Sequence, residues 1–234
     1  MINGMLQASR GCLKETMRMD CIANNLANAT VIGFKKDSVS FQDILGSAGN
    51  TPPLVNVETD MSQGDIVATG NTLDLALNGP GFFKIETLDG IRFTRKGNFS
   101  LNSEGEIVTQ GGHRLLDDNN APLTVNGSDI SISTSGAVTV GDGEEGQIEV
   151  VDFIDYRALE KDGESMYKNV LEETGIIAPD TTIQQGYVES SNVQIAQEMV
   201  TMIHSSRAFE SYQKSLQVLD QVNGKAVNEV GRLR

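Results

Sequence analysis

The C-terminal part of the chain carries the longest run of apolar positions with helical spacing. No proline occurs between Asn192 and Val230, and Gly224 is the one glycine there. Apolar and small residues recur in steps of three and four, a spacing typical of a helix that packs along a narrow line on another helix. This C-terminal contact line comprises Ile195, Met199, Met202, Ser206, Phe209, Tyr212, Leu216, Leu219, Asn223, Ala226 and Val230. The pattern predicts one helix of about 60 Å, at a rise of ~1.5 Å per residue.

The N-terminal residues repeat this spacing and predict a second helix that ends near Asn24 to Asn28. Asparagine favours caps and turns over helix interiors, and Gly33 offers a left-handed position soon afterwards. The N-terminal contact line comprises Ile2, Met5, Ser9, Cys12, Thr16, Met19, Ala23 and Leu26, widened by Leu6 and Leu13. The narrow lines contain Ser, Thr and Asn and favour a pairing of the two helices; the alternative is two amphipathic helices on one compact domain.

The middle of the chain has the short apolar runs and glycine-rich turns of an antiparallel β structure. Asp89-Gly90 separates two such runs and tolerates the positive φ of a two-residue hairpin turn. Further strands are expected at 98–101, 106–109, 130–133, 137–140 and 147–153. The expected fold class is α+β: long N- and C-terminal helices form a coiled-coil-like domain, and a central antiparallel all-β domain forms a sandwich or open barrel.

Three regions follow from these patterns. We predict a terminal helical assembly domain from residues 1–36 with 187–234. Residues 37–70, with Pro52-Pro53 and several glycines, predict an extended connector. Residues 71–186 predict a central β-rich outer domain.

Charge and hydropathy narrow the functional classes. The chain of 234 residues has a net charge of -14, and the acidic excess lies in the middle region. The absence of a basic stripe argues against nucleic-acid binding. No apolar run approaches the ~18 to 20 residues of a transmembrane helix. Charged residues from Arg10 to Asp20 interrupt any signal-peptide core, so we expect a cytoplasmic protein or export with the N-terminus retained.

Candidate chemistry is sparse. Cys12 and Cys21 would be separated by roughly 13 Å on one helix, too far for a disulfide. His113 and His204 have no His or Cys at metal-ligand spacing. The acidic run 141–146 lacks the ligand pattern of a calcium loop and predicts a turn, while Asp117-Asp118 and Glu172-Glu173 predict solvated surface. We therefore expect no catalytic residue, no bound metal and no cofactor.

Two distant motifs resemble a known family. Ala23-Asn24-Asn25-Leu26-Ala27-Asn28 with Gly33-Phe34-Lys35 is similar to the N-terminal signature of flagellar basal-body rod and hook proteins. The C-terminal signature of that family resembles residues 186–193, then Glu198-Met199-Val200 and Arg207-Ala208-Phe209-Glu210. Residues 74–116 are similar to its central domain. The modest length and the sequence from Tyr212 to Arg232 are nearer the proximal-rod branch.

The resemblance implies a structural subunit that polymerises through its terminal helices into the axial drive shaft of the rod. Its implied partners are other copies, other rod proteins and the flagellar export apparatus. It implies a place in the periplasm-spanning rod, reached without a cleaved signal peptide. The near alternative is a distal-rod or hook-like subunit, and the remote one is a cell-wall hydrolase. The residues expected at the assembly interface are Ile2, Met5, Leu6, Cys12, Leu13, Met19, Ala23, Asn24, Asn25, Leu26, Asn28, Gly33, Phe34, Asn192, Ile195, Met199, Met202, Phe209, Tyr212, Leu216 and Leu219.

Overall fold

The fold combines two helices with antiparallel sheets in two compact units. The computed structural model describes residues 2–42, 54–125, 127, 129–141, 143–171, 175–178 and 180–231. The helical unit comprises residues 1–29, 36–60 and 193–234, and the β unit comprises residues 30–35 and 61–192. The predicted α+β class with antiparallel sheets and two helices is confirmed. The coiled-coil geometry, the sandwich or barrel, and the three predicted region limits stay predictions.

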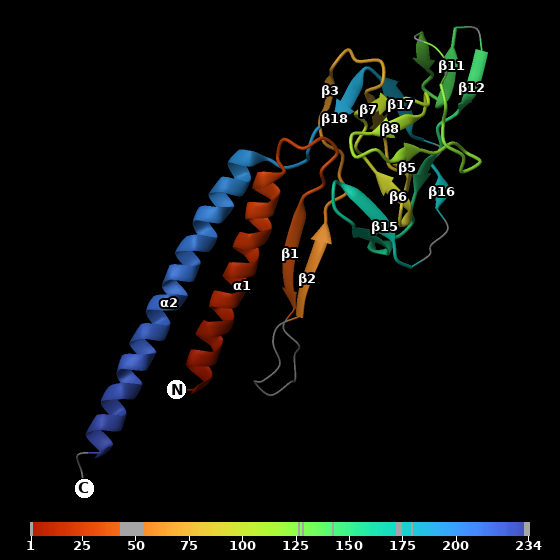
Figure 1. Ribbon diagram of the computed structural model, residues 1–234. Coiled ribbons are helices and arrows are strands. Elements are labelled where there is room, and N and C mark those ends of the chain that lie inside the picture. Colours follow the sequence, from red (N-terminus) through yellow and green to blue (C-terminus); the bar gives the residue numbers. More distant parts are fainter. Residues whose placement is uncertain are drawn as a thin grey trace. The chain divides into compact units, whose positions relative to one another are not determined.

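The helical unit contains an antiparallel pair of helices and a two-stranded hairpin (Figure 1). Helix α1 spans Ile2–Ala27, and α2 spans Ile195–Gly231 and includes Gly224 without a break. Strands β1 (Asp37–Gln42) and β2 (Leu54–Thr59) pair antiparallel, with Asp37 opposite Thr59. Strands therefore occupy part of the region expected to be an extended connector.

Asparagines end α1 and join it to the hairpin. The backbone N–H and the side-chain amide of Asn28 both donate to the carbonyl of Asn24, the latter at 2.8 Å, which caps the last turn. Asn25 is buried, and its amide acts as a strand partner for Asp37. Its Nδ2 donates to the Asp37 carbonyl at 2.8 Å, and its Oδ1 accepts from the Asp37 N–H at 2.9 Å. This pairing satisfies the backbone of Asp37 at the first residue of β1.

Within the described residues, the β unit is made of short strands in four sheets. Its nine-stranded sheet contains β5 (Phe82–Thr87), β6 (Gly90–Thr94), β7 (Phe99–Leu101), β8 (Ile107–Thr109), β9 (Arg114–Leu115), β13 (Val150–Asp152), β14 (Leu159–Lys161), β15 (Met166–Asn169) and β16 (Ile176–Ile177). The three-stranded sheet contains β10 (Ile130–Ile132), β11 (Ala137–Val140) and β12 (Gly143–Gln147). The two-stranded sheets pair β4 (Leu75–Asn78) with β17 (Thr182–Gln185) and β3 (Ile66–Ala68) with β18 (Tyr187–Glu189). A single 3₁₀ turn, η1 (Tyr156–Ala158), precedes β14 among the described residues.

The core of the β unit is formed by alternate residues of these strands. Phe83, Ile85 and Leu75 are fully buried in its main cluster. The ring of Phe83 meets that of Phe99 edge-on, with the centroids 5.3 Å apart. A second cluster surrounds Phe82 and Tyr167. Each such side chain contributes about 1.5–3 kcal/mol on burial.

Two local expectations are corrected by the structure. The predicted hairpin is present as β5 and β6, but Thr87 pairs with Gly90, so Leu88 and Asp89 are the central turn residues. Positive φ occurs at Gly90, at +103°, directly after the two central residues, and not at Asp89, where a type I′ turn centred on Asp89-Gly90 would also require it. The acidic run expected to be a turn lies in strand β12 from Gly143 onward, while Asp142 lies outside the described residues.

Candidate assembly interface

The contact between α1 and α2 is lined on α1 by small residues. Gly11 is buried, and a Cβ at this position would lie 2.5 Å from Cε1 of Tyr212. A Cβ on Gly4 would lie 3.5 Å from Cδ1 of Leu219. Ala8 is also buried. Without side chains beyond a methyl group, this face lets the side chains of Tyr212 and Leu219 lie against the backbone of α1.

This observed contact line lies one residue before the N-terminal line expected from apolar spacing. Ala8, Gly11 and Ile22 are buried, whereas Ser9 and Ala23, which follow two of them, are exposed. The line is shifted by one residue because glycine and alanine make the closest contacts with α2. These small residues add little to the apolar pattern from which the N-terminal line was predicted. On α2, Tyr212 and Leu219 of the expected line do face α1.

The predicted interface residues fall into groups of different exposure. Those exposed at the surface are Leu13, Ala23, Asn24, Ile195, Met199 and Tyr212. Those half-buried are Met5, Leu6, Cys12, Met19, Leu26, Asn28, Asn192, Met202, Phe209, Leu216 and Leu219. Asn25, Gly33 and Phe34 are buried within the subunit, and the side chain of Ile2 lies outside the described part. The exposed apolar members stay candidates for contact with another protein.

A test of the helix contact follows from Gly11. Replacing Gly11 with leucine is expected to destabilise the helical unit by about 1–3 kcal/mol, because the side chain overlaps the ring of Tyr212. The measurement is helical circular dichroism during thermal unfolding. Gly224→Leu is the matched control, since a Cβ there meets nothing within 4 Å. Equal melting of the two variants would contradict the close contact.

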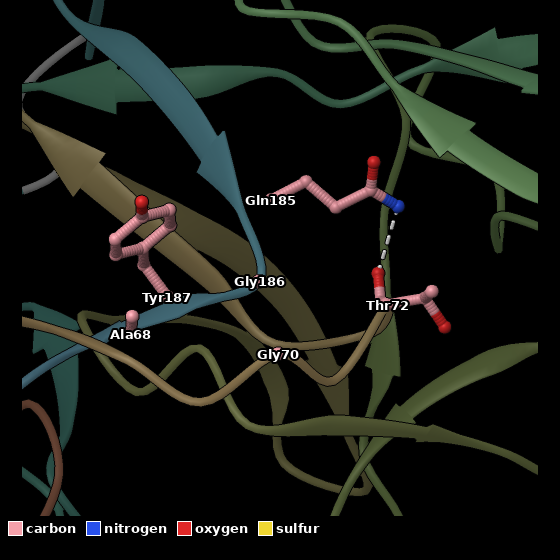
Figure 2. A pocket seen from close by; sticks show the side chains of 6 residues that line it. All are labelled: Ala68, Gly70, Thr72, Gln185, Gly186 and Tyr187. Atoms are coloured by element: carbon pink, nitrogen blue, oxygen red, sulfur yellow. Dashed lines mark hydrogen bonds between the residues drawn. The ribbon is translucent and has the colours of Figure 1, made fainter.

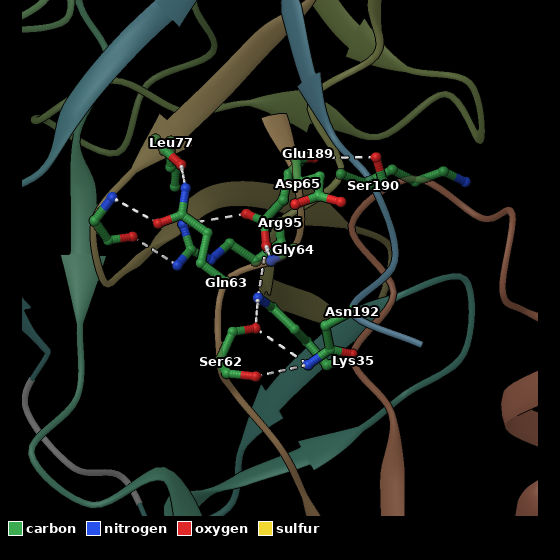
Figure 3. A network of polar contacts seen from close by, with 12 residues as sticks. Lys35, Ser62, Gln63, Gly64, Asp65, Leu77, Arg95, Glu189, Ser190 and Asn192 are labelled. Carbon is green, nitrogen blue, oxygen red and sulfur yellow. Dashed lines mark hydrogen bonds and ion pairs between the residues drawn. The ribbon is translucent and has the colours of Figure 1, made fainter. Parts of the chain in front are cut away.

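The β unit contains a buried ionic cluster, here called the clasp, formed by Lys35, Arg95 and Glu189 (Figure 3). Lys35 Nζ donates to Glu189 Oε1 at 2.6 Å and to the Ser62 carbonyl at 2.7 Å. Arg95 Nη1 lies 3.5 Å from Glu189 Oε2. The Lys35 and Glu189 side chains are each 1% exposed. The cluster therefore places two cations around one carboxylate away from water.

Hydrogen bonds to backbone groups connect the same segments. The Gly33 N–H donates to the Glu189 carbonyl at 2.8 Å, and the Gly64 N–H donates to Glu189 Oε1 at 3.0 Å. Asn192 Nδ2 donates to the Ser62 carbonyl at 3.1 Å. Residues 30–35, which follow α1 in the sequence, are thus bonded to residues 187–192, which precede α2.

Burial shifts the pKa of Arg95, a member of the clasp, and that of Tyr156. Desolvation lowers the pKa of Arg95, and the negative charge of Glu189 opposes this change. Arg95 Nη2 also donates to the Gly79 carbonyl at 2.7 Å. Burial and a hydrogen bond from the hydroxyl of Tyr156 to Asp152 raise the pKa of Tyr156 to about 12. With its pKa raised to about 12, Tyr156 keeps its proton at neutral pH.

A shallow pocket on the β unit is lined by Gly70, Thr72, Gln185 and Tyr187, among others (Figure 2). The Gln185 amide is already bonded within the protein. Its Nε2 donates to the Thr72 carbonyl at 2.9 Å and to the Ile130 carbonyl at 3.0 Å, and its Oε1 accepts from the Ile132 N–H at 3.1 Å. The side chain therefore supports the backbone around it.

Within the described residues, no group of three or more His, Cys, Asp or Glu side chains is arranged to hold a metal. Asp117 Oδ1 accepts from the N–H groups of Asn119 and Ala121 and so shapes a turn. Glu172-Glu173 lies outside the described residues. None of the helices in the described part is both long enough and apolar enough to cross a membrane.

Comparison with known proteins decides the family. A model of the flagellar hook protein FlgE/F/G D1 domain matches residues 76–140, and a model of the flagellar basal body rod FlgEFG protein C-terminal matches residues 184–229. The flagellar basal-body rod protein FlgG of Buchnera aphidicola subsp. Schizaphis graminum is 32% identical, over 95% of this chain and 97% of the relative. The chain belongs to the flagellar basal-body rod protein family. The flagellar basal-body rod protein FlgF of Caulobacter vibrioides is 33% identical over 92% of each chain, and FlgG of Bacillus subtilis is 30% identical over 97% of this chain and 99% of its own.

The rod-family resemblance seen in the two sequence motifs is therefore confirmed, and the clasp gives the motifs a physical meaning. Lys35 comes from the N-terminal motif and Glu189 from the C-terminal motif, and they form one buried ion pair. Sequence analysis missed Arg95 and the α1 glycines as contact residues. A charged residue directly after an apolar one, as in Phe34-Lys35 and Val188-Glu189, is the one available signal of such a cluster.

Proposed function

We propose that this protein is a structural subunit of the flagellar basal-body rod that assembles through exposed apolar faces of α1 and α2. The observation that carries the proposal is the apolar surface left on these helices after they pack together. Leu13 is 45% exposed, Met199 is 51% exposed and Ile203 is 53% exposed. Burying such side chains against a neighbour contributes about 25 cal/mol per Å² of apolar surface.

In this proposal the neighbours are other copies and other rod proteins, and the helical unit supplies the contacts that build the shaft. A repeated contact that does not close into a ring extends as a helical filament. Membership of the rod family supports a place in the basal body. We further propose a periplasm-spanning position, reached through the flagellar export apparatus with the N-terminus retained.

The proximal rod is the position that we propose within the shaft, on the length and C-terminal sequence of the chain. A distal-rod or hook-like position is the second candidate, because one matching family model carries the description of a hook protein domain. A short segment between other rod proteins in isolated basal bodies would support the proximal position. Long polymers of this protein alone would support the second candidate.

Aspartate substitutions on the helices test the proposed function. Leu13→Asp and Met199→Asp are expected to reduce incorporation into basal bodies at least about tenfold, because each buries a charge at the proposed contact. The unfolding midpoint of the free subunit should change little, since both side chains are exposed. The readout is the amount of this protein in purified basal bodies.

Leu88→Asp is the matched control, because Leu88 is a fully exposed leucine of the β unit. It should be incorporated like the unaltered protein. Normal incorporation of both helix variants would contradict assembly through α1 and α2. Absence of the unaltered protein from basal bodies would contradict the rod function itself.

A further inference from the structure

A hollow of about 190 Å³ lies where α1, β1 and α2 meet within the helical unit. Its lining includes Cys21 and Ile22 of α1, Val39 of β1 and Thr201 of α2. The volume is comparable with that of one apolar side chain. The hollow is large enough to admit a side chain from another molecule.

The polar groups that line the hollow are mostly engaged inside the subunit. Both ends of the Asn25 amide are bonded to the backbone of Asp37. Thr201 Oγ1 donates to the Gln197 carbonyl at 2.9 Å, and Cys21 Sγ donates to the Asp37 carbonyl at 3.2 Å. The amide of Asn25, the hydroxyl of Thr201 and the thiol of Cys21 are therefore bonded within the subunit, so the hollow offers an incoming side chain mainly the apolar surface of Ile22 and Val39.

Carboxylates mark the edge of this hollow. Asp37 and Glu198 both contribute to its lining. Arg18, the cation of the lining, is paired with Glu15 at 3.0 Å. An approaching surface therefore meets an apolar hollow beside acidic groups. A complementary surface would combine a protruding apolar side chain with flanking basic residues.

The chain itself carries such a surface on α2. Lys214, Val218, Val222 and Lys225 fall within an arc of roughly 80° at ~100° per residue, and the middle of this arc is about 110° around the helix from Tyr212 and Leu219, which face α1. Val218 is 57% exposed and Val222 is 47% exposed. Two lysines thus flank two exposed valines along one face of the helix.

We propose that the hollow receives Val218 or Val222 from α2 of a second copy, with Lys214 and Lys225 of that copy beside Glu198 and Asp37. This inference rests on the proposed function and names the contact that one copy makes with the next. Hollow and valines occupy different parts of the same unit. The contact is therefore heterologous, and it repeats from copy to copy without closing unless the rotation returns to its start.

Filling the hollow tests the contact. Ser38 lines the hollow from β1 and is exposed, so Ser38→Phe should occupy it with a side chain that suits a strand. Ser40→Phe is the control, because Ser40 lies two residues along on the same strand face, is exposed and is absent from the lining. In the full chain, Ser38→Phe should lower incorporation into basal bodies at least about tenfold relative to Ser40→Phe, with unchanged helicity of the free subunit.

Charge exchange provides the second test. Glu198→Lys should reduce incorporation several-fold, and Lys214→Glu in the same chain should restore most of it, since every copy then carries both exchanged charges while Lys225 still faces Asp37. Restoration would support this pairing of surfaces. Equal incorporation of Ser38→Phe and Ser40→Phe, or no restoration by charge exchange, would overturn the inference. If Leu13→Asp and Met199→Asp still block incorporation in that case, the proposed function stands without this contact.

Discussion

Replacing Glu189 with alanine is expected to destabilise the β unit by about 3–5 kcal/mol, the range for removing one partner of a buried ion pair. The change leaves Lys35 and Arg95 as buried cations with no carboxylate between them. It also removes the acceptor of the Gly64 N–H. The measurement is urea unfolding of the full chain, followed by the near-ultraviolet circular dichroism of buried tyrosine.

Glu86→Ala is the control for this variant. Glu86 pairs with Arg114 at 2.7 Å, but the two side chains are 39% and 42% exposed. An exposed pair contributes only about 0–1 kcal/mol, so the control should unfold almost like the unaltered protein. A loss below about 1 kcal/mol for Glu189→Ala would show that the clasp is hydrated in solution and is not a stabilising contact.

Replacing Gly33 with alanine should cost about 3–4 kcal/mol by the sum of backbone strain and steric overlap. Gly33 has a φ of +68°, which L side chains adopt at a cost. A Cβ there would also lie 2.6 Å from the backbone carbon of Arg95. Because a backbone atom cannot rotate away, residues 30–35 would have to move from the clasp. Urea unfolding again gives the measured quantity.

Gly70→Ala separates the two causes. Gly70 has a φ of +74°, close to that of Gly33, but a Cβ there meets nothing within 4 Å. Its cost should therefore be the conformational part alone, about 1–2 kcal/mol. Equal losses for the two variants would mean that the close approach of Gly33 to Arg95 has no energetic weight.

The clasp joins the two rod-family motifs, which lie far apart in the sequence. Lys35 and Glu189 are 154 positions apart, yet they share a hydrogen bond with almost no exposure. Loss of Glu189 leaves Lys35 of the other motif as a buried cation, and loss of Lys35 leaves Glu189 with Arg95 alone, so each motif contributes one partner of a buried contact.

The sequence by itself determined the elements whose signal is local. The three-four spacing of apolar residues, with no proline from Asn192 onward, determined α2, because a helix repeats every 3.6 residues. Alternation around a turn-forming glycine determined the β5–β6 hairpin, although the turn lies one residue earlier than expected. The paired motifs determined the family, because each is a contiguous string of residues.

Only the tertiary structure decided what depends on closeness in space. The face of α1 that meets α2 follows Gly4, Ala8 and Gly11, since close approach favours the smallest residues and not the most apolar ones. Arg95 joined Lys35 and Glu189 through strand packing, with no local pattern to mark it. The hollow beside Ile22 exists because three separate elements meet without filling the space between them. Such features depend on contacts between residues that are far apart in the sequence, so the spacing of residues within one segment does not predict them.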